Sequence, residues 1–193
     1  MTGELKGKRV AILLSNGFEQ VEMTKPRMAL EEAGAITELI SPAHAEVQGW
    51  NHYEKADHFP VDVELNNADP EQYDALLIPG GVVNSDQLRT YPRAVQFVKR
   101  FRDQHKPIAV ICHGPWMLVE ADVVKGRRVT SWPSLSTDLR NAGANWVDQE
   151  VVVDDGIVTS RKPDDLPAFN REMIQQFQRA HQHEPVGAGQ KTR

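Results

Sequence analysis

The sequence predicts a three-layer α/β sandwich with a mostly parallel central sheet and a peripheral hairpin. Short apolar runs such as residues 108–111 suit strands that are buried on both faces, as in parallel sheets. These runs alternate with segments of helical spacing, which is the order of right-handed βαβ units. Two β-branched runs in residues 151–159 are joined by Asp155-Gly156, which favours a type I′ hairpin turn at the edge of the sheet.

The composition is that of a globular chain. With 193 residues, 40% apolar and 25% charged, the chain can bury a sizeable core, and we expect a single domain over residues 1–180. Residues 181–193 are polar and are expected to fray; His181 and His183 lack the further fixed ligands that a metal site needs. The net charge of -5, without a long basic run, argues against nucleic-acid binding.

The cysteine count and the absence of targeting signals indicate the compartment. A single cysteine cannot form an internal disulfide. Neither a charged-plus-apolar leader nor an apolar segment of about 18 residues is present. We therefore expect a cytoplasmic protein with no membrane partner.

The beginning of the chain predicts two strands joined by a helix. Residues 8–14 form a short apolar run, and residues 37–41 form a second strand that closes a βαβ unit. The helix between them ends at Gly34, and Pro26 either starts it or kinks it.

The pattern then weakens. Residues 46–50 and 61–65 alternate enough to predict two short strands, an edge hairpin. His52, His58 and Pro60 interrupt this pattern.

The middle of the chain contains a strand that leads into paired glycines. Residues 74–78 form a buried strand that runs directly into Pro79-Gly80-Gly81. Paired glycines let backbone N–H groups point at a ligand, although this sequence is also common in tight turns. Pro92 lies in the first turn of the next helix, and Asp86 precedes that helix.

The last third of the chain predicts a strand and a helix before the hairpin and one helix after it. Residues 126–130 form a brief strand, and Ser134 is expected to cap a helix that Gly143 ends. Pro163 opens a final amphipathic helix that covers one face of the sheet.

Cys112 lies at the most informative position in the chain. The apolar strand that precedes it ends at the sequence Cys112-His113-Gly114-Pro115, and Trp116 can begin a helix. A strand-to-helix turn tends to strain and expose its central residue, and free N–H groups nearby favour a thiolate. The alternative is an inert core thiol, since free cysteine is among the most buried residue types.

Several chemically active residues follow the carboxyl ends of strands, where ligand sites of open parallel sheets lie. Glu19, the pair Gly80-Gly81 and the pair Cys112-His113 all fall at such ends. These residues are far apart in the chain, so the fold would have to bring them together. Their convergence predicts a site at one edge of the sheet.

The expected chemistry is that of a cysteine nucleophile. Cys112 attacks, and His113 donates and accepts protons with Asp86 as the acid that orients its ring. The N–H groups of Gly81 and His113 complete an oxyanion pocket. The alternative for His113 is a surface or structural histidine.

Glu19 allows two interpretations. It is a solvated carboxylate at the start of a helix, or a carboxyl held close to the Cys112 sulfur. The second interpretation requires a protonated Glu19 with a raised pKa, because a carboxylate would repel the thiolate.

Four segments together resemble the PfpI family. They are residues 109–115, 79–81, 18–22 and 130–134, and the resemblance runs in order from about residue 8 to residue 178. This family belongs to the superfamily of the parkinsonism-associated deglycase and the class I glutamine amidotransferase domains.

The resemblance implies a flavodoxin-like sandwich and an oligomer, a dimer or larger, with the site near a subunit interface. It implies a nucleophile at Cys112, its histidine at His113 and a carboxyl at Glu19. In some relatives the acid that orients the histidine comes from a neighbouring subunit, and Asp86 is at about that position. Trp132 is where an aromatic residue near the pocket is usual.

Three functions remain open at this point. The leading hypothesis is a cytoplasmic stress-response enzyme in which Cys112 attacks small reactive carbonyls or their protein adducts, as a glyoxalase or deglycase, without a metal or other cofactor. The second is a cysteine peptidase or amidase. The third, of another class, is a redox sensor or holdase whose Cys112 is oxidised to sulfinic acid.

Overall fold

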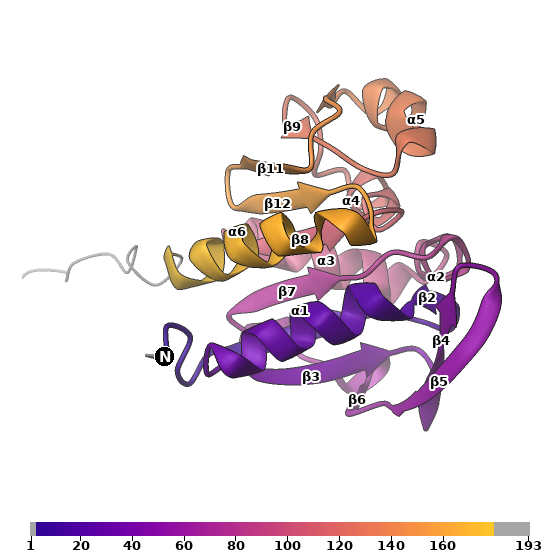
Figure 1. The fold of residues 1–193 in the computed structure, drawn as a ribbon, viewed down its shortest axis with the longest axis vertical. Helices are drawn as coiled ribbons and strands as arrows, with labels where there is room; N and C mark the ends of the chain where they lie inside the picture. The colour runs from indigo at the N-terminus through magenta and orange to yellow at the C-terminus, as the bar shows by residue number, and fades with distance from the viewer. Residues whose placement is uncertain (1–2, 180–193) are drawn as a thin grey trace, which may run out of the picture.

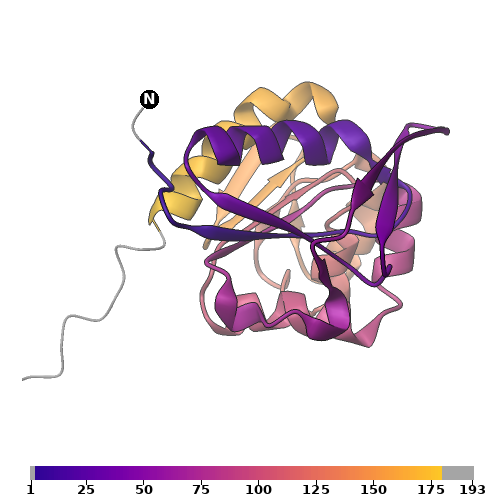
Figure 2. The same cartoon turned by 90° about the horizontal axis from the view of Figure 1, so that it is seen from below.

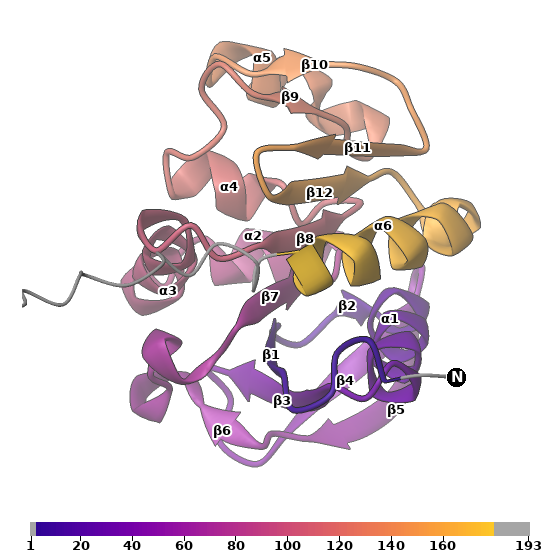
Figure 3. The ribbon, with the colours of Figure 1, turned by 90° about the vertical axis from the view of Figure 1, so that its left-hand side faces the viewer.

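The computed structural model describes residues 3–179, which fold around a seven-stranded sheet (Figure 1). In spatial order its strands are β11 (Val151–Asp154), β12 (Ile157–Ser160), β8 (Ile108–Ile111), β7 (Ala75–Ile78), β1 (Arg9–Leu13), β3 (Ile36–Ser41) and β6 (Val63–Glu64), as Figure 3 shows. Only β11 runs antiparallel to its neighbour within this sheet. The predicted fold class, a mostly parallel α/β sandwich with a peripheral hairpin, is confirmed.

Helices cover both faces of the sheet (Figure 2). The helices α1 (Gln20–Glu32) and α6 (Leu166–Arg179) lie on one face, and α2 (Val82–Leu88), α3 (Pro92–Asp103), α4 (Trp116–Glu120) and α5 (Ser136–Asn141) belong to the other side. Successive side chains of β1 point to opposite faces. Val10 and Ile12 pack with α1 and α6, whereas Ala11 and Leu13 pack with α3 and α4. This double burial explains why the strand reads as a continuous apolar run.

Two small sheets flank the main one. The first joins β2 (Phe18–Glu19), β4 (Glu46–Asn51) and β5 (Glu54–Pro60), and the second joins β9 (Arg128–Val129) and β10 (Asn145–Trp146). Four short 3-10 helices complete the described elements: η1 (Leu65–Asn67), η2 (Pro70–Gln72), η3 (Pro133–Leu135) and η4 (Pro163–Asp165). The predicted turn at Asp155-Gly156 has φ angles of 46° and 76°, as a type I′ turn requires.

Several local predictions are wrong. The hairpin partner of β4 is β5 rather than residues 61–65, because β5 is largely exposed and shows no clear alternation. Asp86 precedes α3 as predicted but lies inside α2, a helix that was not predicted, and Pro26 lies inside α1 rather than at its start. Ser134 lies in η3, and the residue before α5 is Leu135, which makes no side-chain cap.

Two further predictions concern the ends of the chain and membranes. The expected fraying of residues 181–193 falls outside the described residues. Within residues 3–179, no helix combines the length and the hydropathy that a membrane crossing requires.

Candidate active site

Cys112 lies at the turn between β8 and α4, as the sequence predicts. Its φ of 63° is in the left-handed region, which costs a residue with a side chain about 1–3 kcal/mol. Two backbone hydrogen bonds hold it there: its N–H donates to Ser160 O at 3.0 Å, and its carbonyl accepts from Trp132 N–H at 2.9 Å. Gly114 makes the turn possible, because a Cβ there would lie 2.7 Å from Val110 Cγ1.

An imidazole, a carboxyl and two amides surround the sulfur. His113 Nδ1 lies 3.2 Å from Sγ of Cys112. The Glu22 side chain and the backbone N–H groups of Gly81 and His113 also interact with this sulfur. Cys112 is 7% exposed and His113 is 8% exposed, so both residues are largely shielded from solvent.

The carboxyl that interacts with the sulfur belongs to Glu22, which corrects the assignment of this role to Glu19. Glu22 is fully buried, and its Oε2 accepts the Gly80 N–H at 2.9 Å. Its Oε1 has no aligned hydrogen-bond partner among the described residues, although the carboxyl and the thiol change each other's pKa. Helical spacing could have indicated this, since Glu22 shares a face with the buried Pro26 and Leu30.

Glu19 faces the hairpin instead. It lies in the extended strand β2, before α1 begins, and its Oε2 accepts the His52 N–H at 3.0 Å. The His52 ring is 3.7 Å from the same oxygen. Glu19 still contributes to the site, because its charge raises the pKa of Glu22.

The two glycines fit the site closely. A Cβ on Gly80 would lie 2.5 Å from Glu22 Oε2 and 2.6 Å from Cys112 Cβ. Gly81 has a φ of 92°, and a Cβ there would lie 2.4 Å from Gly17 O. Their missing side chains let Gly80 N–H reach Glu22 and Gly81 N–H reach the sulfur.

The thiol and the Glu22 carboxyl both resist ionisation. Burial raises the pKa of Cys112 and the charge of Glu22 adds to this, while the N–H groups of Gly81 and His113 lower it. Burial raises the pKa of Glu22 to about 8, against the opposing effect of the Gly80 N–H. The sequence predicts a thiolate; in the structure, burial and the Glu22 carboxyl favour the neutral thiol, and Glu22 loses its proton near pH 8.

His113 lies among aromatic rings rather than beside an acid. Trp132 stacks on its ring with centroids 5.9 Å apart, and the edge contact to Trp116 measures 5.5 Å. Burial lowers the pKa of His113 to about 4, so the ring is neutral at pH 7 and is a weak base. Trp132 is 39% exposed, so the ring that stacks on His113 lies at the surface.

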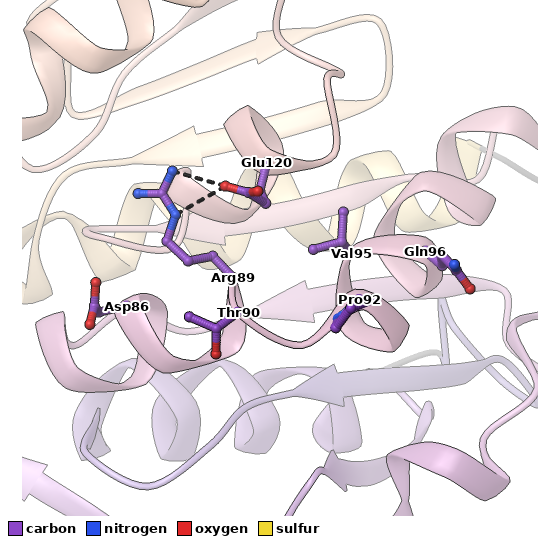
Figure 4. A pocket seen from close by; sticks show the side chains of 7 residues that line it. All are labelled: Asp86, Arg89, Thr90, Pro92, Val95, Gln96 and Glu120. Carbon is purple, nitrogen blue, oxygen red and sulfur yellow. Dashed lines mark hydrogen bonds and ion pairs between the residues drawn. The ribbon is translucent and has the colours of Figure 1, made fainter.

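Asp86 does not meet His113 within one chain. Among the described residues, no hydrogen bond or ion pair joins the two. Asp86 instead lines a surface pocket of about 700 Å³ with Arg89, Thr90, Pro92, Val95, Gln96 and Glu120 (Figure 4). Its assignment as the orienting acid, supplied from a neighbouring subunit, stays a prediction.

In residues 3–179, no group of three or more His, Cys, Asp or Glu side chains is placed to hold a metal ion.

Comparison with known proteins gives one consistent family. The DJ-1/PfpI family model matches residues 8–176. An uncharacterised protein of Staphylococcus haemolyticus is 51% identical over 174 residues, which are 89% of this chain and 98% of that protein. An uncharacterised protein of Staphylococcus aureus (strain N315) is 49% identical over 174 residues, 89% of this chain and 99% of its own.

Solved structures share the fold. A two-domain protein of Anabaena variabilis with DJ-1/ThiJ/PfpI-like and ferritin-like domains is 32% identical with a TM-score of 0.81; the match covers 87% of this chain and 47% of that one. DJ-1 of Schizosaccharomyces pombe is 20% identical with a TM-score of 0.78, and the match covers 93% of this chain and 100% of that one. These matches show that the chain has the flavodoxin-like fold of the DJ-1 and ThiJ/PfpI proteins.

Proposed function

Because the chain belongs to the DJ-1/PfpI family, we propose that it is a cytoplasmic, cysteine-dependent enzyme that acts on small reactive carbonyls or their early protein adducts. One observation carries the proposal: the sulfur of Cys112 is held on a strained turn between Glu22, His113 and inward-facing amides. This arrangement supplies a nucleophile, a proton carrier and oxyanion donors within one small space.

The burial of the site favours a small substrate. Cys112 is only 7% exposed. A small aldehyde can reach its sulfur more easily than an extended peptide, because it needs less room. Two surface pockets, of about 700 Å³ and 270 Å³, are lined by neither Cys112 nor His113. A peptidase would also need an acid to orient His113, and no such bond exists among the residues described. The peptidase alternative is therefore less well supported.

The first step is addition of the thiol to the aldehyde carbon of a substrate such as methylglyoxal. The S–C bond forms while the thiol proton passes to ionised Glu22, and the carbonyl π electrons move to oxygen. The N–H groups of Gly81 and His113 stabilise the alkoxide. Glu22 returns the proton to that oxygen, which gives a hemithioacetal. With a pKa of about 8, Glu22 suits both transfers better than His113 does.

The second step is an internal redox change. A proton leaves the former aldehyde carbon while the neighbouring carbonyl oxygen gains one, which gives an enediol. A proton then adds to the second carbon as the hydroxyl on the first carbon loses its proton. The first carbon reaches the oxidation level of a thioester and the second becomes an alcohol, so no external oxidant is needed. Water then cleaves the C–S bond, which releases lactate and restores the thiol.

Turnover of methylglyoxal tests the proposal. We expect the wild type to form lactate and Cys112→Ser to form it at least about 10²-fold more slowly, because the nucleophile is lost. Lactate is measured after a fixed incubation, with unfolding curves to show that the variant is folded. Asp86→Asn in the same assay lowers kcat only if this acid reaches His113 in the assembly.

Two results would redirect the proposal. Equal lactate formation by the wild type and Cys112→Ser would contradict the carbonyl reaction. Cleavage of a fluorogenic peptide that depends on Cys112 would support the peptidase instead.

A redox sensor is the second candidate, and Glu22 Oε1 favours it. This buried oxygen has no aligned partner among the described residues, so a protonated Glu22 can donate to a sulfinate oxygen on Cys112. We expect dilute peroxide to add two oxygen atoms to the wild type and none to Cys112→Ser, as read from intact masses. Equal oxidation of both proteins, on methionine, would remove this candidate.

A further inference from the structure

Asn84 is a fully buried side chain of α2 whose hydrogen bonds, within residues 3–179, all go to backbone groups. Its Oδ1 accepts the Ser15 N–H at 2.6 Å, in the loop after β1. Its Nδ2 donates to Pro79 O at 3.1 Å and to Gly80 O at 3.0 Å, in the turn after β7. One carboxamide therefore ties together the loops that follow two neighbouring strands.

The two accepting carbonyls belong to consecutive peptide units. The peptide bonds described here contain no cis bond, and in a trans peptide the C=O and the N–H point in opposite directions. Holding the Pro79 carbonyl toward Asn84 turns the Gly80 N–H the other way, where it donates to Glu22 Oε2 at 2.9 Å. Holding the Gly80 carbonyl likewise turns the Gly81 N–H toward the sulfur of Cys112.

In the part of the chain that the structure describes, the other hydrogen bonds to this turn each involve a single peptide unit. Glycine has no side chain and adopts many backbone conformations, so Gly80 and Gly81 cannot fix their own peptide planes. The Gly80 carbonyl accepts one further hydrogen bond, from Glu19 N–H at 3.2 Å. Among residues 3–179, Asn84 alone donates to both carbonyls, because its Nδ2 has two hydrogens to donate.

We propose that Asn84 is a positioning residue that directs the Gly80 and Gly81 N–H groups at Glu22 and Cys112 and so sets the reactivity of the thiol. The inference rests on the proposed use of Cys112 as the reacting group, and it does not depend on the identity of the substrate.

Alkylation of Cys112 by iodoacetamide between pH 6 and pH 10 tests the proposal. In Asn84→Ala, the midpoint of the pH profile should rise by about one unit, and the rate at pH 7 should fall about tenfold. Ser85→Ala is the matched control, since Ser85 is the next residue of α2, is equally buried, and has an Oγ without a partner among the described residues. We expect this control to keep the wild-type midpoint.

The alkylation profiles of the two variants decide whether Asn84 sets the reactivity of the thiol. An unchanged midpoint in Asn84→Ala, or an equal shift in Ser85→Ala, would overturn the proposal. If Asn84→Ala does not fold, NMR on the wild type decides: both Asn84 side-chain amide protons should exchange slowly with solvent, and fast exchange overturns the proposal. A shifted midpoint without lactate formation by the wild type would remove the proposed reaction and leave the role of Asn84 intact.

Discussion

The stability of Glu22→Gln relative to the wild type is expected to increase by about 5 kcal/mol as the pH is raised from 4 to 9. The reason is that glutamine removes a buried carboxyl whose pKa is about 8 instead of the ordinary 4.5. Glutamine keeps the shape of the side chain. Its carbonyl can accept the Gly80 N–H that Glu22 Oε2 accepts at 2.9 Å. The difference therefore reports the titration of Glu22 rather than a lost contact.

The sign follows from where the proton is bound. Between the two pKa values the unfolded chain has lost the Glu22 proton while the folded protein still holds it, so wild-type stability falls as the pH rises. The contribution of protonated Glu22 to the stability is fully present below about pH 4.5 and is lost as the pH rises through about 8. The stability of Glu22→Gln does not fall in this way, because glutamine does not titrate.

Urea unfolding of both proteins at several pH values measures the effect. Glu71→Gln is a surface control with the opposite sign, because Arg100 holds the pKa of the Glu71 carboxyl below its ordinary value. That variant should be less stable than the wild type at neutral pH, and the difference should disappear in acid. Parallel curves for the wild type and Glu22→Gln would show that Glu22 is ionised in the folded protein.

Gly81→Ala is expected to cost at least about 3 kcal/mol more than Gly126→Ala and to abolish most alkylation of Cys112. Both glycines have positive φ, 92° and 76°, so alanine strains both backbones. They differ in the room for an added Cβ. A Cβ on Gly81 would lie 2.4 Å from Gly17 O and 2.7 Å from Glu19 N, whereas a Cβ on Gly126 would have no atom within 4 Å.

Gly126→Ala therefore measures the conformational cost alone, about 1–2 kcal/mol. In Gly81→Ala the chain must move away from β2, which also displaces the N–H that faces the sulfur. Unfolding free energies and alkylation rates of the two variants give the comparison. If Gly81→Ala matched Gly126→Ala in both measurements, the close fit of this turn around the thiol would be wrong.

The fold could be predicted because its strands have a simple signature. β1, β7 and β8 are buried on both faces, so each is a continuous apolar run with a turn after it. The same signature placed Cys112 at the strand-to-helix turn, where its φ of 63° confirms the expected strain. β5 escaped the prediction because its exposed side chains show no alternation.

The partners of Cys112 were harder to predict because they depend on where elements begin. Glu19 and Glu22 are three residues apart, and only the start of α1 at Gln20 decides which carboxyl turns toward the sulfur. Asn84 gave no sequence signal, since its role consists of hydrogen bonds to three backbone groups from two other loops. The depressed pKa of His113 likewise reflects burial in the folded chain.

The pH profile of Cys112 alkylation in the wild type and in Glu22→Gln tests the pairing of thiol and carboxyl most directly. In the wild type the rate should level off near pH 8, because the first proton lost belongs to the pair and a second must leave beside a negative charge. In Glu22→Gln the rate should match the wild type below that pH and keep rising above pH 9, since burial alone then holds the thiol pKa high. Profiles with the same midpoint in both proteins would contradict the account.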